Sequence, residues 1–339
     1  MFALKKPNSL SLALIILLIA NNALAQIALE NPQGTIERKS PALDAVIKKN
    51  AKVEVIARGF EWVEGPVWVE SKKMLLVSDV LKNQIYKWTV KKGKELYLEP
   101  SGYTQEKPRG GELGSNGLSL NKKGKLVLCQ HGDRRLAVMN ATLNNQKPEF
   151  TTLTGQYKGK KYNSPNDLAI KSNGDIYFTD PPYGLEKGMS DPLKEISYQG
   201  VYKISKGGTV TLLTDTLSRP NGIAFFPGEK SLLVANSDPE KPNWYIYDVD
   251  NNGLLLNGRI FYDGTKAYEK ENRSPDGIKI DDKGNVFAAG PGGVWIFNKK
   301  GNVIGRIKLN IITSNCAFAN NYKTLFITAD DYLLKVDLR

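Results

Sequence analysis

Histidine and cysteine are scarce in this 339-residue sequence, which contains one histidine and two cysteines. Centres built from several imidazoles or thiolates, which zinc and copper prefer, are therefore not expected. Cys129 and Cys316 lie far apart in apolar, strand-like stretches. We expect two buried free thiols, although an exported chain would permit a disulfide. Helical periodicity is also nearly absent and is confined to Ser40–Asn50, which indicates a mainly β protein.

Long apolar runs are missing except near the N-terminus. Basic Lys5 and Lys6 precede the apolar run Leu10–Ala20, and the small residues Ala23–Ala25 follow it. This pattern predicts a signal peptide over residues 1–25, cleaved after Ala25, with an uncleaved anchor as the alternative. Because no other transmembrane candidate exists, we expect a periplasmic or secreted protein that does not associate with the membrane after cleavage.

The chain has few acidic residues relative to basic ones, and its formal net charge is +12. The lysines are dispersed, mostly as pairs in turns such as Lys122–Lys123 and Lys299–Lys300. A dispersed surplus is typical of solvated loops, so no nucleic-acid partner is expected. A weak role in attracting anionic substrates stays open.

One pattern recurs six times along the chain: a polar residue, a small residue, an alternating strand, a turn and a second strand. Two copies read "NDLAIKSNGDIYFTD" and "NGIAFFPGEKSLLVAN". The leading polar residues are 39 to 55 residues apart, and further short strands follow within most copies. Repeats of this length with about four strands each predict a six-bladed β-propeller with a central metal site. The leading residues are Glu64, Asn116, Asn166, Asn221, Asp276 and Asn315.

The chain ends indicate how the propeller closes. The last copy is short, and the strand-like segment Lys52–Ala57 precedes the first copy. This segment is expected to supply the outer strand of the last blade, which would remove two exposed sheet edges. We therefore predict a lead-in segment with a short helix over residues 26–50 and a single propeller domain over residues 51–339.

The six leading residues are expected to converge at one mouth of the central channel, because each begins an innermost strand. Carboxylates and amide oxygens suit a hard cation such as Ca²⁺, which takes six to eight oxygen ligands. Mg²⁺, Mn²⁺ and Zn²⁺ remain alternative ions. A single Asn or Asp in "PNG" or "PDG" is more often a turn former, but six in register favour a ligand set.

Several motifs together resemble the gluconolactonase/regucalcin (SMP-30/gluconolactonase/LRE) family of six-bladed propellers. They are "GFEWVEGPVW", "SPNDLAI", "GDIYFTDPPYGL", "RPNGIAF", "SPDGIKID" and "TSNCAFANNYKTLFITA", and the resemblance covers residues 58–339. The stretch "CQHGDRR" is similar to the bacterial gluconolactonase branch. The resemblance implies that Glu64, Asn166, Asn221 and Asp276 hold the metal.

The resemblance also assigns Asp276 as the catalytic base or nucleophile. That role conflicts with metal coordination, which lowers the basicity of a carboxylate, so Asp167 is kept as a second catalytic candidate. An alternative role for Asp167 is structural: its side chain would form a hydrogen bond to the backbone of its own turn. His131 is a candidate proton shuttle, with a surface or structural role as the alternative. Substrate contacts are expected from Asn116, Arg134, Tyr183 and Asn315.

These features predict a secreted Ca²⁺-dependent hydrolase of sugar lactones, in which the metal polarises the carbonyl. One alternative is a phosphotriesterase-like hydrolase on the same site. Another is a non-catalytic propeller that binds a ligand and contains structural Ca²⁺. A small-molecule lactone partner and a monomer are expected.

Overall fold

The computed structural model describes residues 34–339. The predicted signal peptide, its cleavage site and the start of the lead-in segment lie outside these residues. Within the described part of the chain, no helix is both long enough and apolar enough to cross a membrane.

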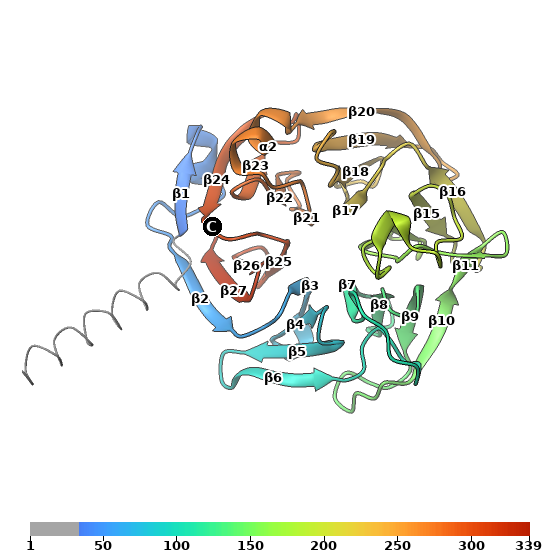
Figure 1. Ribbon diagram of the computed structural model, residues 1–339. Helices are drawn as coiled ribbons and strands as arrows, with labels where there is room; N and C mark the ends of the chain where they lie inside the picture. The colour runs from blue at the N-terminus through green and yellow to red at the C-terminus, as the bar shows by residue number, and fades with distance from the viewer. Residues whose placement is uncertain (1–33) are drawn as a thin grey trace, which may run out of the picture. The chain divides into compact units, whose positions relative to one another are not determined.

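The predicted six-bladed propeller is confirmed: six antiparallel sheets surround a central axis (Figure 1). In each of the first four blades, four consecutive strands form one sheet. These blades contain β3 (Val63–Val69), β4 (Met74–Asp79), β5 (Gln84–Thr89) and β6 (Gly93–Leu98); β7 (Ser115–Leu120), β8 (Leu126–Gln130), β9 (Arg135–Met139) and β10 (Phe150–Thr154); β13 (Leu168–Ile170), β14 (Ile176–Asp180), β15 (Gly200–Ile204) and β16 (Val210–Thr214); and β17 (Pro220–Phe225), β18 (Ser231–Asn236), β19 (Asn243–Val249) and β20 (Leu255–Asp263).

The last two blades each include a strand from the N-terminal end of the described chain. The fifth contains β21 (Ile278–Ile280), β22 (Val286–Gly290), β23 (Gly293–Phe297), β24 (Val303–Leu309) and β1 (Gly34–Arg38). The sixth contains β25 (Asn315–Ala319), β26 (Thr324–Ala329), β27 (Tyr332–Asp337) and β2 (Val53–Arg58). Small elements between strands are the hairpin β11 (Gln156–Tyr157) and β12 (Lys160–Lys161), the 3₁₀ turns η1 (Pro41–Ala45), η2 (Glu70–Lys72) and η3 (Gly188–Ser190), and α2 (Thr265–Glu271).

The predicted closure is confirmed by the pairing of β2 with β27, in which Val53 lies opposite Val336 (Figure 1). Strands from opposite ends of the chain thus complete one blade and remove two free edges. The sequence patterns did not point to β1, which adds a fifth strand along β24 with Gly34 opposite Leu309. The short helix expected in the lead-in segment is the five-residue η1, whose first turn Ser40 caps.

The hydrophobic core lies between the blades, where the face of one sheet packs on the next. Trp244, Trp295 and Phe297 form one such cluster, with Trp244 and Phe297 ring centroids 5.6 Å apart. Trp88 and Trp295 are both buried and belong to clusters of this kind. Cys129 and Cys316 are free and buried, as expected, and burial raises the pKa of both thiols.

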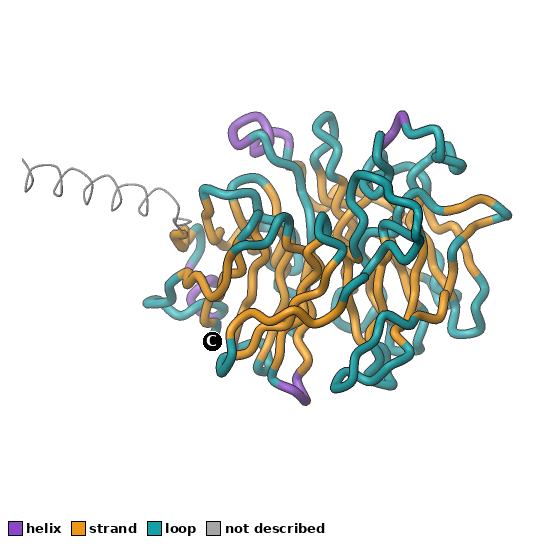
Figure 2. The backbone as a smooth tube through the Cα atoms, turned by 60° about the horizontal axis from the view of Figure 1, so that its bottom comes forward, coloured by secondary structure: helices purple, strands orange, loops and turns teal. Residues whose placement is uncertain are grey.

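The first strand of each blade lies at the axis and contacts the first strands of both neighbouring blades, which closes a ring. Loops gather at the two ends of the strands, and α2 belongs to the set at one end (Figure 2). The residues that begin the innermost strands are thereby brought together, although they are far apart in sequence.

Candidate functional site

A cavity of about 290 Å³ opens at one mouth of the central channel. Five of the six leading residues line it: Glu64, Asn116, Asn166, Asn221 and Asp276. The sixth, Asn315, lies behind Glu64, to whose Oε2 its Nδ2 donates a hydrogen bond of 3.3 Å. The structure therefore brings together all four predicted metal ligands in one wall.

Close approach of the blades at this mouth depends on the glycine that follows four of the six leading residues. A Cβ on Gly222 would lie 2.3 Å from the carbonyl oxygen of Asp276, and one on Gly117 would lie 2.7 Å from that of Asn166. Neither position has room for a side chain, so glycine is required for neighbouring innermost strands to meet. The amide of Gly117 uses this proximity to donate to the carbonyl of Asn166 at 2.7 Å.

Each turn that precedes a metal-ligand candidate in blades one, three and four is held by an acid or amide at the end of the second strand. Asp180 accepts hydrogen bonds from the amides of Asn163 and Ser164, both at 2.8 Å, just before Asn166. Asp79 and Asn236 occupy the matching positions in the other two blades and accept from backbone amides in the same way. These supporting residues were not predicted, although the repeat copies end in "VSD", "FTD" and "VAN".

Glu64 is a buried carboxylate with two hydrogen-bond donors on one oxygen. Its Oε2 accepts from the Gly65 amide at 2.8 Å and from Asn315. Burial, with the nearby Asp167 charge as a smaller cause, raises the pKa of Glu64 to about 8 against the lowering effect of these donors. A nearby cation would offset both causes.

Asp276 is the second carboxylate of the wall. Its Oδ1 is buried and has no hydrogen-bond partner. Burial, followed by the charges of Glu64, Asp167 and Glu112, raises its pKa well above the ordinary value. An unpartnered oxygen beside a second carboxylate is costly in a folded protein unless a cation is bound there.

The donor set fits a hard cation. It combines two carboxylates with the amide side chains of Asn166 and Asn221, which suits Ca²⁺ coordination by oxygen. Among residues 34–339, no three His, Cys, Asp or Glu side chains cluster in a way that could hold a metal. The carboxylate and amide oxygens of the wall fit an ion that accepts neutral amide oxygens, rather than one that needs imidazole or thiolate.

Asp167 lies outside the cavity wall, one level further along the channel. Its Oδ1 accepts from the Leu168 amide at 2.8 Å, the local bond that the turn-forming interpretation anticipates. Its Oδ2 lies 3.8 Å from Lys279 Nζ, which also donates to Asn315 Oδ1 at 3.1 Å. Asp167 thus belongs to a polar layer behind the wall, together with Asn315.

His131 is completely buried behind the wall, at the turn between β8 and β9. Its Nε2 lies 3.5 Å from Asn166 Nδ2, and its Nδ1 lies 2.9 Å from Glu112 Oε2. The contact with Glu112 is close but not aligned as a hydrogen bond. Glu112 itself lines the cavity, so His131 reaches the site through Glu112 and Asn166.

The two remaining predicted substrate contacts have different positions. Tyr183 lines the cavity, and burial raises its pKa. Arg134 is buried away from the wall, where its guanidinium donates to the carbonyls of Tyr162 at 2.6 Å and Leu193 at 2.9 Å. These hydrogen bonds connect separate segments of the chain. The guanidinium of Arg134 therefore binds backbone carbonyls and does not line the cavity.

Several residues of the cavity wall were not predicted from the sequence. Glu112 and Arg219 lie four and two residues before the leading residues of their blades, so the repeat register could have pointed to them. Ser237, Tyr268 and Arg273 come from loops whose positions no repeat pattern indicates.

Comparison with known proteins agrees with this architecture. The model of the SMP-30/Gluconolactonase/LRE-like region matches residues 62–331. A gluconolactonase of Zymomonas mobilis is 39% identical over 322 residues, which cover 92% of this chain and 89% of that protein. The lactonase drp35 of Staphylococcus aureus (strain USA300) is 26% identical over 273 residues, which cover 77% of this chain and 78% of that protein.

A solved structure from Xanthomonas campestris, described as a gluconolactonase, superposes with a TM-score of 0.76 at 28% identity, covering 90% of this chain and 95% of that one. A regucalcin structure from Agrobacterium tumefaciens shares the fold, with a TM-score of 0.64 at 16% identity and coverage of 85% and 94%. The match to the family model spans most of the propeller. The chain therefore belongs to the SMP-30/gluconolactonase/LRE-like family.

Proposed function

We propose that this chain is an exported, Ca²⁺-dependent enzyme that hydrolyses the ester bond of sugar lactones. The observation that carries the proposal is the convergence of Glu64, Asn166, Asn221 and Asp276 on one cavity, with an unpartnered carboxylate oxygen among them. The lactonase names of the relatives support the reaction class. Export rests on the N-terminal signal-like sequence.

The two carboxylates and two asparagines would hold the ion. When bound, Ca²⁺ supplies a Lewis acid that polarises the lactone carbonyl. The remaining wall determines how the sugar is oriented: Asn116 and Arg219 offer hydrogen-bonding groups, and Tyr183 offers an aromatic ring. A cavity of about 290 Å³ suits a small ligand at the lower end of pocket sizes.

The test is a hydrolysis panel with metal-stripped protein. Gluconolactone and lactones of other ring sizes are assayed with and without added Ca²⁺, Mg²⁺, Mn²⁺ or Zn²⁺. We expect hydrolysis that chelation abolishes and Ca²⁺ restores, and a loss of activity in Asp276→Ala. Full activity after exhaustive chelation would refute the metal dependence.

The same panel separates the alternatives. A higher kcat/KM for a phosphotriester than for any lactone would assign the site to phosphotriester hydrolysis. A loss of thermal stability on chelation, without hydrolysis of any substrate, would assign it to a non-catalytic propeller with structural Ca²⁺.

A further inference from the structure

Glu112 is an acidic residue on the cavity wall that has no role in the proposed metal site. We propose that Glu112 is the general base of the site and takes the proton of the attacking water. This inference rests on the proposed lactone hydrolysis, and it resolves the conflict of using Asp276 both as ligand and as base. The carboxylate of Glu112 is partly exposed in the cavity, with 29% of the side chain accessible.

The other acidic and basic candidates are less suited to this role. Glu64 and Asp276 would be committed to the ion, which lowers their basicity. Asp167 does not line the cavity and is held by the Leu168 amide beside Lys279. His131 is fully buried and does not line the cavity. Among the wall residues that the structure describes, Glu112 is the remaining carboxylate.

Glu112 faces the same volume as the metal-ligand candidates. Its charge contributes to raising the pKa of Asp276 and of Tyr183, which places the three groups within electrostatic reach across the cavity. A base must lie within hydrogen-bond reach of the water whose proton it accepts. Because Glu112 lines the same cavity as the ligand candidates, a water bound in that cavity would be within its reach.

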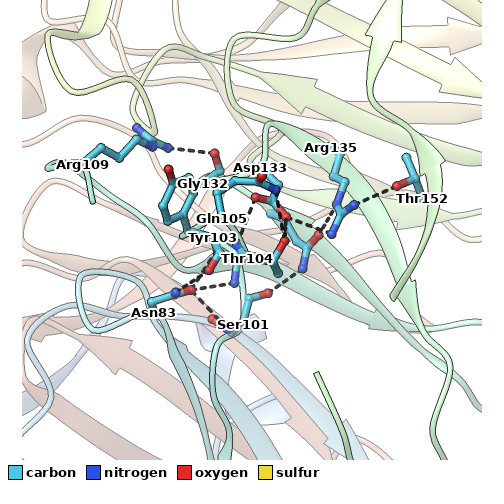
Figure 3. A network of polar contacts seen from close by, with 12 residues as sticks. Asn83, Ser101, Tyr103, Thr104, Gln105, Arg109, Gly132, Asp133, Arg135 and Thr152 are labelled. Atoms are coloured by element: carbon cyan, nitrogen blue, oxygen red, sulfur yellow. Dashed lines mark hydrogen bonds and ion pairs between the residues drawn. The ribbon is translucent and has the colours of Figure 1, made fainter. Parts of the chain in front are cut away.

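The loop that carries Glu112, between β6 and β7, is anchored at several points (Figure 3). Asn83 Oδ1 accepts from the amides of Ser101, Gly102 and Tyr103 at 2.7 to 3.1 Å. Asp133 accepts from the hydroxyl of Thr104 at 2.6 Å. These bonds hold the start of the loop against the first blade through Asn83 and against the second blade through Asp133.

Arg109 anchors the same loop close to Glu112. Its Nη2 donates to the Gly132 carbonyl at 3.0 Å (Figure 3). Its Nη1 donates to the Gly184 carbonyl at 2.9 Å. Gly132 directly follows His131, and Gly184 directly follows Tyr183. One guanidinium therefore links the Glu112 loop to both neighbouring segments of the site, which preorganises the base.

His131 is the positioning residue for Glu112. Its fully buried Nδ1 lies 2.9 Å from Glu112 Oε2, and Glu112 lines the cavity. The same ring contacts Asn166 through Nε2 at 3.5 Å, so one buried imidazole links the base to a ligand candidate. This close approach restricts the positions that the Glu112 carboxylate can take, although the two groups are not aligned as a hydrogen bond.

The step balances as an ordinary ester hydrolysis. The water oxygen forms a bond to the lactone carbonyl carbon, the carbonyl π electrons move to the carbonyl oxygen, and the water proton passes to Glu112. When the tetrahedral intermediate collapses, the bond to the ring oxygen breaks. The proton on Glu112 then passes to that oxygen, which becomes the product hydroxyl, and the acid formed releases a proton to solvent.

The test compares Glu112→Gln with Glu106→Gln, a control that removes an exposed acid from the same loop. For Glu112→Gln we expect kcat to fall by about 100-fold or more. The Ca²⁺ dissociation constant, measured by calorimetry, should stay within about 3-fold of wild type, because Glu112 is not a ligand. The control should keep wild-type kcat. In Glu112→Ala, added sodium formate should restore part of kcat by replacing the lost carboxylate.

Each other outcome has a defined meaning. An unchanged kcat in Glu112→Gln, or a parallel loss of Ca²⁺ binding, overturns the assignment of Glu112 as base. If wild type hydrolyses no lactone, the proposed function fails first. If Glu112→Gln does not fold, Glu112→Asp is measured instead, because the shorter side chain withdraws the base. A kcat that is unchanged in Glu112→Asp overturns the proposal.

Discussion

The metal-free protein should become more stable when Glu64 is replaced with glutamine. Burial and the Asp167 charge raise the pKa of Glu64 from 4.5 to about 8 in the folded state. A carboxyl group whose pKa is higher in the folded state binds its proton more tightly there. Its contribution to stability is therefore fully present below pH 4.5 and is lost as pH rises through 8.

The magnitude follows from the same shift. At pH 7 the unfolded chain ionises Glu64 freely while the folded chain does not, which costs the folded state about 3 kcal/mol. Glutamine removes this cost but weakens the hydrogen bonds that Glu64 Oε2 accepts from Gly65 and Asn315, a loss of about 1 kcal/mol. The net expectation is a gain of about 2 kcal/mol in the free energy of unfolding.

Urea unfolding in excess chelator measures this change, at pH 7 and again at pH 5. The gain should disappear at pH 5, because the cost of ionising Glu64 then falls to about 0.8 kcal/mol, which the weakened hydrogen bonds offset. Glu61→Gln is the matched control: it removes an exposed acid three residues away and should change stability by less than about 0.5 kcal/mol. A Glu64→Gln protein that is less stable at pH 7, or a gain that persists at pH 5, would refute this electrostatic account.

Three further predictions concern the ion, the supporting acids and the core. Ca²⁺ at 100 times its dissociation constant for wild type should stabilise wild type by about 2.7 kcal/mol and Asp276→Asn by far less, as thermal unfolding would show. If Ca²⁺ stabilised the two proteins equally, the ligand set would be wrong. Asp180→Ala, measured by urea unfolding at pH 4, should destabilise by about 2 to 4 kcal/mol, because two buried amides lose their shared acceptor, whereas Asp175→Ala at the outer end of the same hairpin should cost under about 1 kcal/mol. Burial raises the pKa of Asp180 to about 7, and at pH 4 the ionisation cost that the substitution removes is small. Burial raises the pKa of Tyr97 to about 12, so the free energy of unfolding should fall as pH rises from 10 through 12. Tyr97→Phe should reduce that fall by about 2 kcal/mol. The same pH dependence of stability in wild type and Tyr97→Phe would contradict this prediction.

The blades and the polar residues that meet at the channel mouth could be predicted because both are periodic. Every copy carries its own strand alternation, its own turn residues and one polar residue at the start of the innermost strand. Strand β2 could be placed for a related reason, since a short last copy needs an outer strand and the segment before the first copy supplies one. Periodic signals depend only on local chemistry repeated along the chain.

Features that break the repeat could not be predicted in this way. Strand β1 lies outside the repeated copies and pairs with the fifth blade, so no copy signals its partner. Arg134 resembles a substrate-binding residue in sequence, yet its guanidinium binds the carbonyls of Tyr162 and Leu193. Which acceptors a long basic side chain reaches depends on segments distant in sequence, so tertiary packing decides its partners.

By itself, therefore, the sequence determined the number of blades, their closure by β2 and the polar residues that begin the innermost strands, since strand period and turn chemistry act locally. Only the tertiary structure decided which of those residues share a cavity. It placed Asp167 and Asn315 behind the wall, buried His131, and brought Glu112 from the loop between β6 and β7 to face Asp276. The physical reason is that burial, charge and hydrogen-bond partners at the axis are set by six blades meeting at once, and no single repeat contains that information.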